Sequence, residues 1–136
     1  MGLDMYMYST DKHIESLEVE NREKEGEERE EDQAEIGYWR KHNRLHGWFQ
    51  EKWYNRHSDA DTDFNCVRYY LNAEELNELY DAVKNEKLPA TEGFFFGDDS
   101  YSYEWLQEQK KEDLEIIETA KKEIEEGRFV YYSCWW

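Results

Sequence analysis

A stretch of 22 residues, from Ile36 to His57, is net positive and densely aromatic within a chain that is otherwise strongly acidic. The stretch reads IGYWRKHNRLHGWFQEKWYNRH and carries a charge of +4 in a chain of −17, so the remaining residues carry −21. Charges that served solubility alone would be interspersed along the sequence. This basic aromatic block therefore indicates a binding site or a contact between structural elements, and any fold must bury its large rings.

The spacing of large side chains in the block predicts a single helix whose aromatic stripe faces the core. The residues that recur at helical spacing are Ile36, Trp39, Asn43, His46, Phe49 or Gln50, and Trp53. Gly47 lies inside this helix and weakens it, because glycine is a poor helix former.

A length of 136 residues predicts one domain, 1–136, with one hydrophobic core. The hydrophobic fraction is only 38%, but 6 Trp, 11 Tyr and 6 Phe bring enough apolar area for that core. Residues 15–35 have a net charge of −8 and no aromatic side chain, so they predict an acidic insertion or arm within the domain.

Elsewhere in the chain, four segments favour strands and two favour helices. The helix at Ala73–Asn85 follows a capping box formed by Asn72 and Glu75, and the helix at Tyr103–Glu126 ends at Gly127. The expected strands are Leu3–Tyr8, Cys66–Leu71 and Arg128–Trp135, with a further short strand before the last helix. We therefore expect an α+β fold in which a small, mostly antiparallel sheet packs against two or three helices.

The sequence also indicates the compartment in which the protein is found and the kinds of partner that it can bind. Cys66 and Cys134 cannot build a disulfide framework and are expected to be buried thiols in a reducing compartment. No signal peptide and no apolar run of ~20 residues is present, so we expect a cytoplasmic protein that does not insert into a membrane. The acidity disfavours direct binding to nucleic acids and favours a partner with a basic surface, whereas the oligomeric state stays open.

Four short motifs stand out: the opening MGLDMY, the run EIGYWRK followed by HGWF, the loop LPATEGFFFG, and the aromatic C-terminal strand. Together they resemble a family of small bacteriophage and prophage proteins. The resemblance covers both ends and the middle of the chain, and residues 15–33 look like an addition to it. It implies an accessory protein for host takeover or counter-defence, and it implies no catalytic residue.

Metal and catalytic motifs are weak in this chain. His42 and His46 stand four residues apart, which puts two imidazoles on one helical face, as in zinc sites. A zinc protease needs Glu directly after the first histidine, but Asn43 stands there, and the nearby Arg40 and Arg44 oppose a cation. We therefore expect no metal, no cofactor and no enzymatic activity, with an uncharacterised small enzyme as the third alternative.

The first binding hypothesis is an acidic inhibitor that binds a basic groove of a host protein. Its carboxylates would imitate the phosphates of the nucleic acid that the groove normally binds. In the acidic arm the partner-binding carboxylates would be Glu27, Glu28, Glu30, Glu31 and Asp32. On the outer face of the last helix they would be Glu108, Glu112, Asp113, Glu115, Glu118, Glu123, Glu125 and Glu126. The structural alternative is a solvated helix with i,i+4 ion pairs, such as Glu118 with Lys122.

The second binding hypothesis is a pocket that sequesters a nucleotide or signalling molecule by ring stacking and guanidinium contacts. Its residues would be Tyr38, Arg40, His42, Arg44, His46, Trp48, Glu92, Phe94, Phe95 and Phe96. The structural alternative is that Arg40 and Arg44 pair with carboxylates while the aromatic rings form the core.

Overall fold

A four-stranded antiparallel sheet, with the strand order β2-β1-β4-β3, forms the centre of the molecule. The computed structural model describes residues 3–19, 32–59, 63–89 and 101–136. The elements in chain order are β1 (Asp4–Thr10), the 3₁₀ helix η1 (Glu15–Glu18), β2 (Gln33–Arg40), α1 (Asn43–Arg56), β3 (Arg68–Leu71), α2 (Ala73–Lys84), α3 (Tyr103–Glu125) and β4 (Phe129–Trp135). This confirms the expected α+β class.

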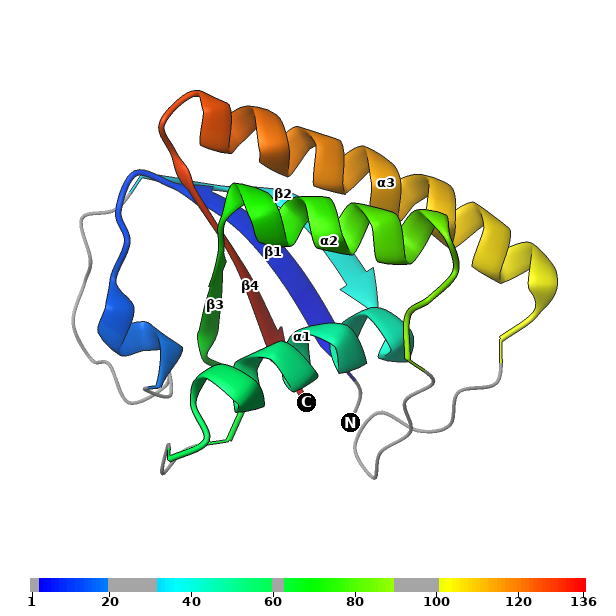
Figure 1. The fold of residues 1–136 in the computed structure, drawn as a ribbon, viewed down its shortest axis with the longest axis horizontal. Coiled ribbons are helices and arrows are strands. Elements are labelled where there is room, and N and C mark those ends of the chain that lie inside the picture. Colours follow the sequence, from blue (N-terminus) through cyan, green and yellow to red (C-terminus); the bar gives the residue numbers. More distant parts are fainter. Residues whose placement is uncertain (1–2, 20–31, 60–62, 90–100) are drawn as a thin grey trace.

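The three α-helices cover one face of the sheet, in front of the strands in Figure 1. The strands send alternate side chains toward these helices, so Met5 and Met7 of β1 are fully buried between the two layers. The core is completed mainly by Trp39, Phe49, Trp53, Phe64, Tyr69, Leu76, Leu79, Val83, Ile117, Val130 and Tyr132. Cys66 and Cys134 are buried and form no disulfide, as expected.

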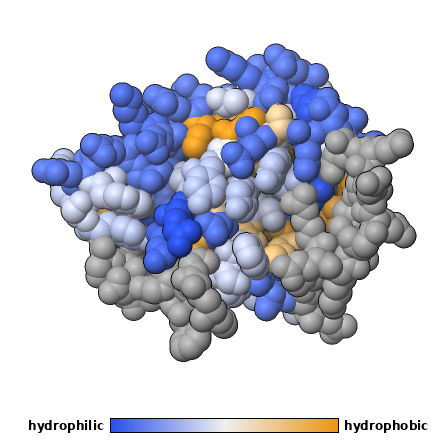
Figure 2. Space-filling model, turned by 180° about the vertical axis from the view of Figure 1, so that it is seen from behind, coloured by the Kyte–Doolittle hydropathy of each residue, from blue (hydrophilic) through white to orange (hydrophobic). Residues whose placement is uncertain are grey.

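The opposite face of the sheet carries a row of tyrosines. Tyr38 of β2 lies 5.3 Å from Tyr6 of β1, measured between ring centroids, and Tyr8 lies 5.2 Å from Tyr131 of β4. Figure 2 looks at this side and shows a pale area of intermediate hydropathy in its middle, with hydrophobic patches above and below it and hydrophilic residues toward the periphery. An antiparallel sheet tolerates such a half-open face because helices bury only the other one.

The single helix expected over the basic aromatic block is wrong in its first third. The residues up to Arg40 belong to the edge strand β2, and the helix begins only at Asn43. Gly37 and Trp39 face the helices while Tyr38 faces solvent, which is the period of two of a strand. Trp39 satisfies both periods, so spacing alone could not separate them. Lys41, with a φ of 55°, turns the chain between the two elements.

The acidic segment 15–35 has ordered ends. Glu15–Glu18 forms η1, whose Leu17 and Glu18 are buried, and residues 33–35 open β2. Residues 20–31, which make up the middle of the expected arm, lie outside the described residues, as does the stretch 90–100 where a short strand was expected.

Local sequence signals place the other helices correctly. Asn72 Oδ1 accepts from the Glu75 amide at 2.8 Å, and Glu75 Oε1 accepts from the Asn72 amide at 3.2 Å, which is the predicted capping box. α3 ends where predicted, and Gly127 takes the left-handed conformation (φ 88°) that glycine adopts without strain.

Gly37 sets how closely α3 approaches the sheet. A Cβ atom at this position would lie 2.6 Å from Ile116 Cγ2 of α3 and 3.2 Å from its Cδ1 atom. A glycine inside a strand often marks such a close approach of another element. The helix therefore packs directly over the backbone of β2.

The substitution Gly37→Ala is expected to destabilise the fold by about 1–3 kcal/mol, because the new methyl group pushes α3 away from β2. Ile116→Ala on the same background should recover part of that loss, since it removes the two Ile116 atoms and leaves only Trp39 Cη2, at 3.2 Å, close to the new methyl group. Urea unfolding of the two single variants and the double variant measures the coupling. Effects that add to within about 0.5 kcal/mol would rule out the contact.

Candidate functional site

A buried carboxylate, Asp113 of α3, joins three elements on the helical side of the sheet. Its Oδ1 accepts from Trp39 Nε1 at 2.6 Å and from Gln109 Nε2 at 2.9 Å, and its Oδ2 lies 2.7 Å from His42 Nε2. Asp113 is 1% exposed and His42 3%. A carboxylate oxygen accepts hydrogen bonds, so the tautomer of His42 that fits this contact carries its proton on Nε2 and donates it to Asp113.

The elements bring these groups together for local reasons. Trp39 points toward the helices because it occupies an inward position of β2, and His42 is the residue immediately before α1. Asp113 lies four residues before Ile117 and seven before Ala120, so all three share the buried stripe of α3. The expectation that Asp113 belongs to the outer acidic face is therefore wrong.

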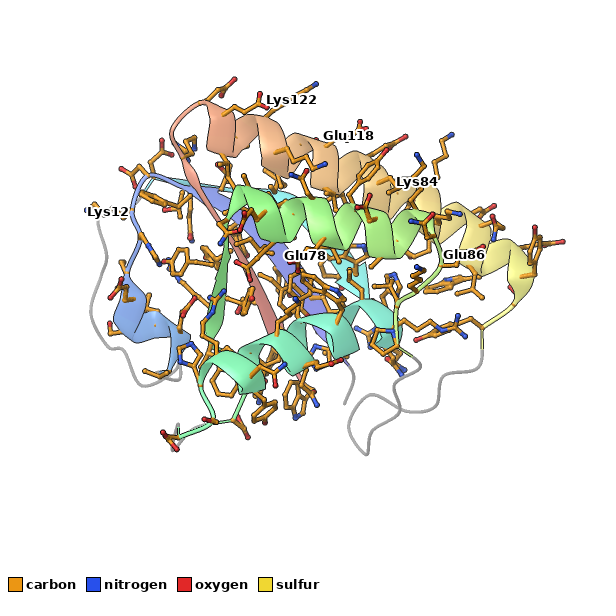
Figure 3. The ribbon with its side chains drawn as sticks, viewed as in Figure 1. Lys12, Glu78, Lys84, Glu86, Glu118 and Lys122 are labelled. Carbon is orange, nitrogen blue, oxygen red and sulfur yellow. The ribbon has the colours of Figure 1, made fainter. Side chains whose placement is uncertain are left out.

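Beside this cluster lies a recess of about 60 Å³ between the start of α1, the end of α2 and α3. It is lined by His42, Arg44, Val83, Glu86, Leu88, Leu106, Gln109, Lys110 and Asp113. At about 10–15 Å³ for each water, the recess has room for a group of about four to six heavy atoms. Glu86, labelled in Figure 3, accepts from Gln107 Nε2 at 3.0 Å.

The second ring nitrogen of His42 is an exception among these polar groups. Nδ1 is buried and has no hydrogen-bond partner, although Nε2 is held by Asp113. A buried nitrogen without a hydrogen-bond partner costs about 1–3 kcal/mol, so such groups are rare in native proteins. This nitrogen is the strongest chemical signal in the described structure.

Two stacked rings close this end of the molecule. Tyr101 and Trp105 lie 4.3 Å apart, and Trp105 meets the His42 ring edge-on at 5.4 Å. The Tyr101 hydroxyl donates to the Lys41 carbonyl at 2.6 Å and accepts from the Asn43 amide at 2.9 Å. The beginning of α3 is thereby tied to the turn that leads into α1.

The residues of the predicted pocket do not form one cluster. Tyr38 and Arg40 lie on the sheet face away from the helices, where Arg40 pairs with Asp4 at 3.2 Å. Trp48 is buried on α1, beneath the ammonium group of Lys52. Of the predicted set, the recess is lined by His42 and Arg44. Glu92, Phe94, Phe95 and Phe96 lie outside the described residues.

His46 belongs to the core rather than to the recess. Its Nδ1 lies 2.8 Å from the Tyr132 hydroxyl, and its ring packs against Phe64. Burial lowers the pKa of His46 to about 4, so the side chain is neutral near pH 7. The two histidines at zinc-like spacing therefore have separate partners. Within the described ranges, no three His, Cys, Asp or Glu side chains gather to hold a metal ion.

The C-terminal end of the basic block anchors acidic residues inside the fold. Arg56 binds Glu18 at 2.9 Å and Glu75 at 2.8 Å, and His57 Nε2 lies 2.9 Å from the other Glu18 oxygen. Arg56 also donates to the Tyr69 hydroxyl at 2.9 Å. The charges and hydrogen bonds of these groups are paired within the network, so we interpret the network as a structural contact rather than a binding site.

The outer face of α3 is acidic and open. Its exposed glutamates are Glu104, Glu108, Glu112, Glu115, Glu118, Glu125 and Glu126, while Glu123 is partly exposed. In the described part of the chain none of them forms an ion pair, the expected one between Glu118 and Lys122 included. Figure 3 shows both of these side chains on the side of α3 away from α2.

The acidic arm contributes less to the described surface. Asp32 is exposed and lies 3.4 Å from Arg128. Glu27, Glu28, Glu30 and Glu31 fall outside the described residues.

No protein-family profile, curated protein or solved structure matches this chain. None of the described helices is long and apolar enough to pass through a lipid bilayer.

Three residues that matter here, Gln109, Lys110 and Trp105, were missed in the sequence, and Asp113 was assigned to the outer acidic face instead of the interior. Asp113 had a usable signal, since a charged residue four positions before a buried isoleucine interrupts the apolar stripe of α3. The others take part only because α1 and α3 meet in space, which no local pattern reports.

The depressed pKa of His46 predicts a specific loss of stability in acid. Between about pH 6.5 and pH 4 the unfolded chain takes up a proton on this imidazole and the folded chain does not, so stability falls as pH falls. The full effect is about 3 kcal/mol and is absent above that window.

Urea unfolding of wild type and His46→Gln across this window measures the effect. The wild type should lose stability more steeply, by about 1.4 kcal/mol per pH unit within the window. Because the other acidic groups titrate in both proteins, their contribution to the pH dependence of stability cancels in the difference between the two profiles. Parallel pH profiles of the two proteins would contradict the assignment.

Proposed function

We propose that the chain is a non-catalytic accessory protein that acts by binding a basic surface of another protein through the outer face of α3. The observation that carries the proposal is the set of seven exposed glutamates on this face without ion-pair partners among the described residues. A face of this kind attracts cationic surfaces and repels polynucleotides and anionic membranes.

The partner class follows from the size and charge of that face. α3 has 23 residues and is about 35 Å long, close to one helical turn of B-form DNA. Exposed cations on it are few: Lys111 and Lys122. A groove that accepts nucleic-acid phosphates would meet a comparable line of negative charge. The partner is therefore a nucleic-acid-binding or defence protein, which the face would block as a nucleic-acid mimic.

The same proposal includes the biological origin of the chain and the cell compartment in which it acts. The sequence motifs resemble proteins of bacteriophages, whose accessory genes serve takeover of the host or counter-defence, so the chain would act in the cytoplasm of a bacterial cell. Internal pairing of Arg56 and Arg40 with carboxylates supports binding through the acidic exterior rather than through the basic block.

Displacement from DNA tests the proposal. Proteins of a bacterial lysate are bound to DNA-cellulose, and the purified chain is added at low and at high salt. We expect it to release one or more bound proteins at low salt and to lose this ability at high salt, because screening weakens contacts between exposed charges.

The decisive variant replaces Glu108, Glu112 and Glu115 of α3 by Gln, and it should release little or nothing. The matched control replaces three exposed acids elsewhere, Glu15→Gln, Glu51→Gln and Asp59→Asn, and removes the same charge. The control should act like wild type. Equal loss in both variants, or no displacement by wild type, would contradict the proposal.

A further inference from the structure

We propose that the recess beside His42 is a binding site for a phosphate group, either inorganic phosphate or the phosphate of a small phosphomonoester. The site is separate from the outer face of α3 and does not depend on the function proposed above. Of the nucleotide pocket predicted from the sequence, this site keeps His42 and Arg44, the two predicted residues that line the recess.

The first argument is the orientation of the imidazole. Trp39, Gln109 and His42 all donate to Asp113, so the carboxylate fixes the His42 ring through Nε2. The opposite nitrogen, Nδ1, is buried without a hydrogen-bond partner, in a ring that lines the recess. A ligand that exchanges a hydrogen bond with Nδ1 removes the cost of that unpaired group.

The second argument is the charge of the lining. Arg44 from α1 and Lys110 from α3 contribute two cations, and Glu86 and Asp113 contribute two carboxylates. Asp113 already has three hydrogen-bond partners, and Glu86 accepts from Gln107. Lys110 has no hydrogen-bond or ion-pair partner among the residues that the structure describes, so its ammonium group is available to an anion.

The third argument selects phosphate among anions. A phosphate monoester loses its second proton near pH 6, so one proton is available near neutral pH to lie between a phosphate oxygen and an imidazole nitrogen. The hydrogen bond forms whether the proton sits on the oxygen or on Nδ1. Sulfate has no such proton and needs the imidazole to be charged.

Size and polarity agree with this choice. Room for about four to six heavy atoms matches one phosphate group and not a whole nucleotide. Val83, Leu88 and Leu106 form an apolar wall, against which the carbon skeleton of a phosphomonoester would pack while its remainder extends to solvent.

Titration of the full chain tests the site, with inorganic phosphate, AMP and sulfate as probes and with calorimetry and ³¹P NMR as readouts. We expect phosphate to bind and sulfate to bind far more weakly. Tighter binding of AMP than of phosphate identifies the phosphomonoester as the source, and equal binding identifies inorganic phosphate.

The matched variants are Lys110→Ala and Lys111→Ala, which remove the same charge from adjacent positions of α3. Lys110 lines the recess and Lys111 is exposed, so phosphate affinity should fall about tenfold in the first and stay unchanged in the second. His42→Phe keeps a ring of similar shape beside Trp105 and should abolish binding. Circular dichroism establishes that each variant is folded.

Three results would overturn the proposal: no binding of phosphate or AMP at millimolar concentrations, sulfate binding as tightly as phosphate, or equal losses in the two lysine variants. The Gln variant of Glu108, Glu112 and Glu115 should retain phosphate binding. Failure of the phosphate site is therefore distinguishable from failure of partner binding through α3.

Discussion

The buried carboxylate of Asp113 is the interaction on which the arrangement of the helices over the sheet depends. A charge withdrawn from water is costly unless donors surround it, and here the donors come from β2, from the residue before α1 and from α3 itself. The three elements must therefore meet in one geometry. The hydrogen bond between His42 Nε2 and Asp113 fixes the imidazole ring and leaves Nδ1 without a partner. The contact that stabilises the fold therefore also shapes the candidate site at the recess.

The charged side chains of the protein fall into two groups: those that form ion pairs within the fold and those that stay exposed without a partner among the described residues. Inside or close to the fold, cations of the basic block neutralise nearby carboxylates, as Arg40 does for Asp4 and Arg56 does for Glu18 and Glu75. The exposed glutamates on the outer face of α3 have no such ion-pair partners within the described residues, so their charges face solvent uncompensated. The sign reversal in the sequence thus separates cations that pair with carboxylates inside the fold from carboxylates that stay exposed on α3.

Prediction from the sequence succeeded where one local signal sufficed. α2 follows from a capping box and α3 from a long apolar stripe that ends at a glycine. It failed at β2, because Trp39 fits both the helical and the strand period and only pairing with β1 decides between them. The recess was beyond reach for a related reason: Asp113 and His42 are 71 residues apart and meet only after the helices have packed.

The arrangement of the helices and the proposed phosphate site both presuppose the geometry around Asp113, so the tautomer of His42 is the most direct test. Long-range ¹H–¹⁵N NMR on the free protein at neutral pH reports which ring nitrogen carries the proton. The structure predicts a protonated Nε2 in slow exchange with water, an unprotonated Nδ1, and a similarly protected indole N–H of Trp39. A proton on Nδ1 instead, or rapid exchange at both sites, would contradict the arrangement.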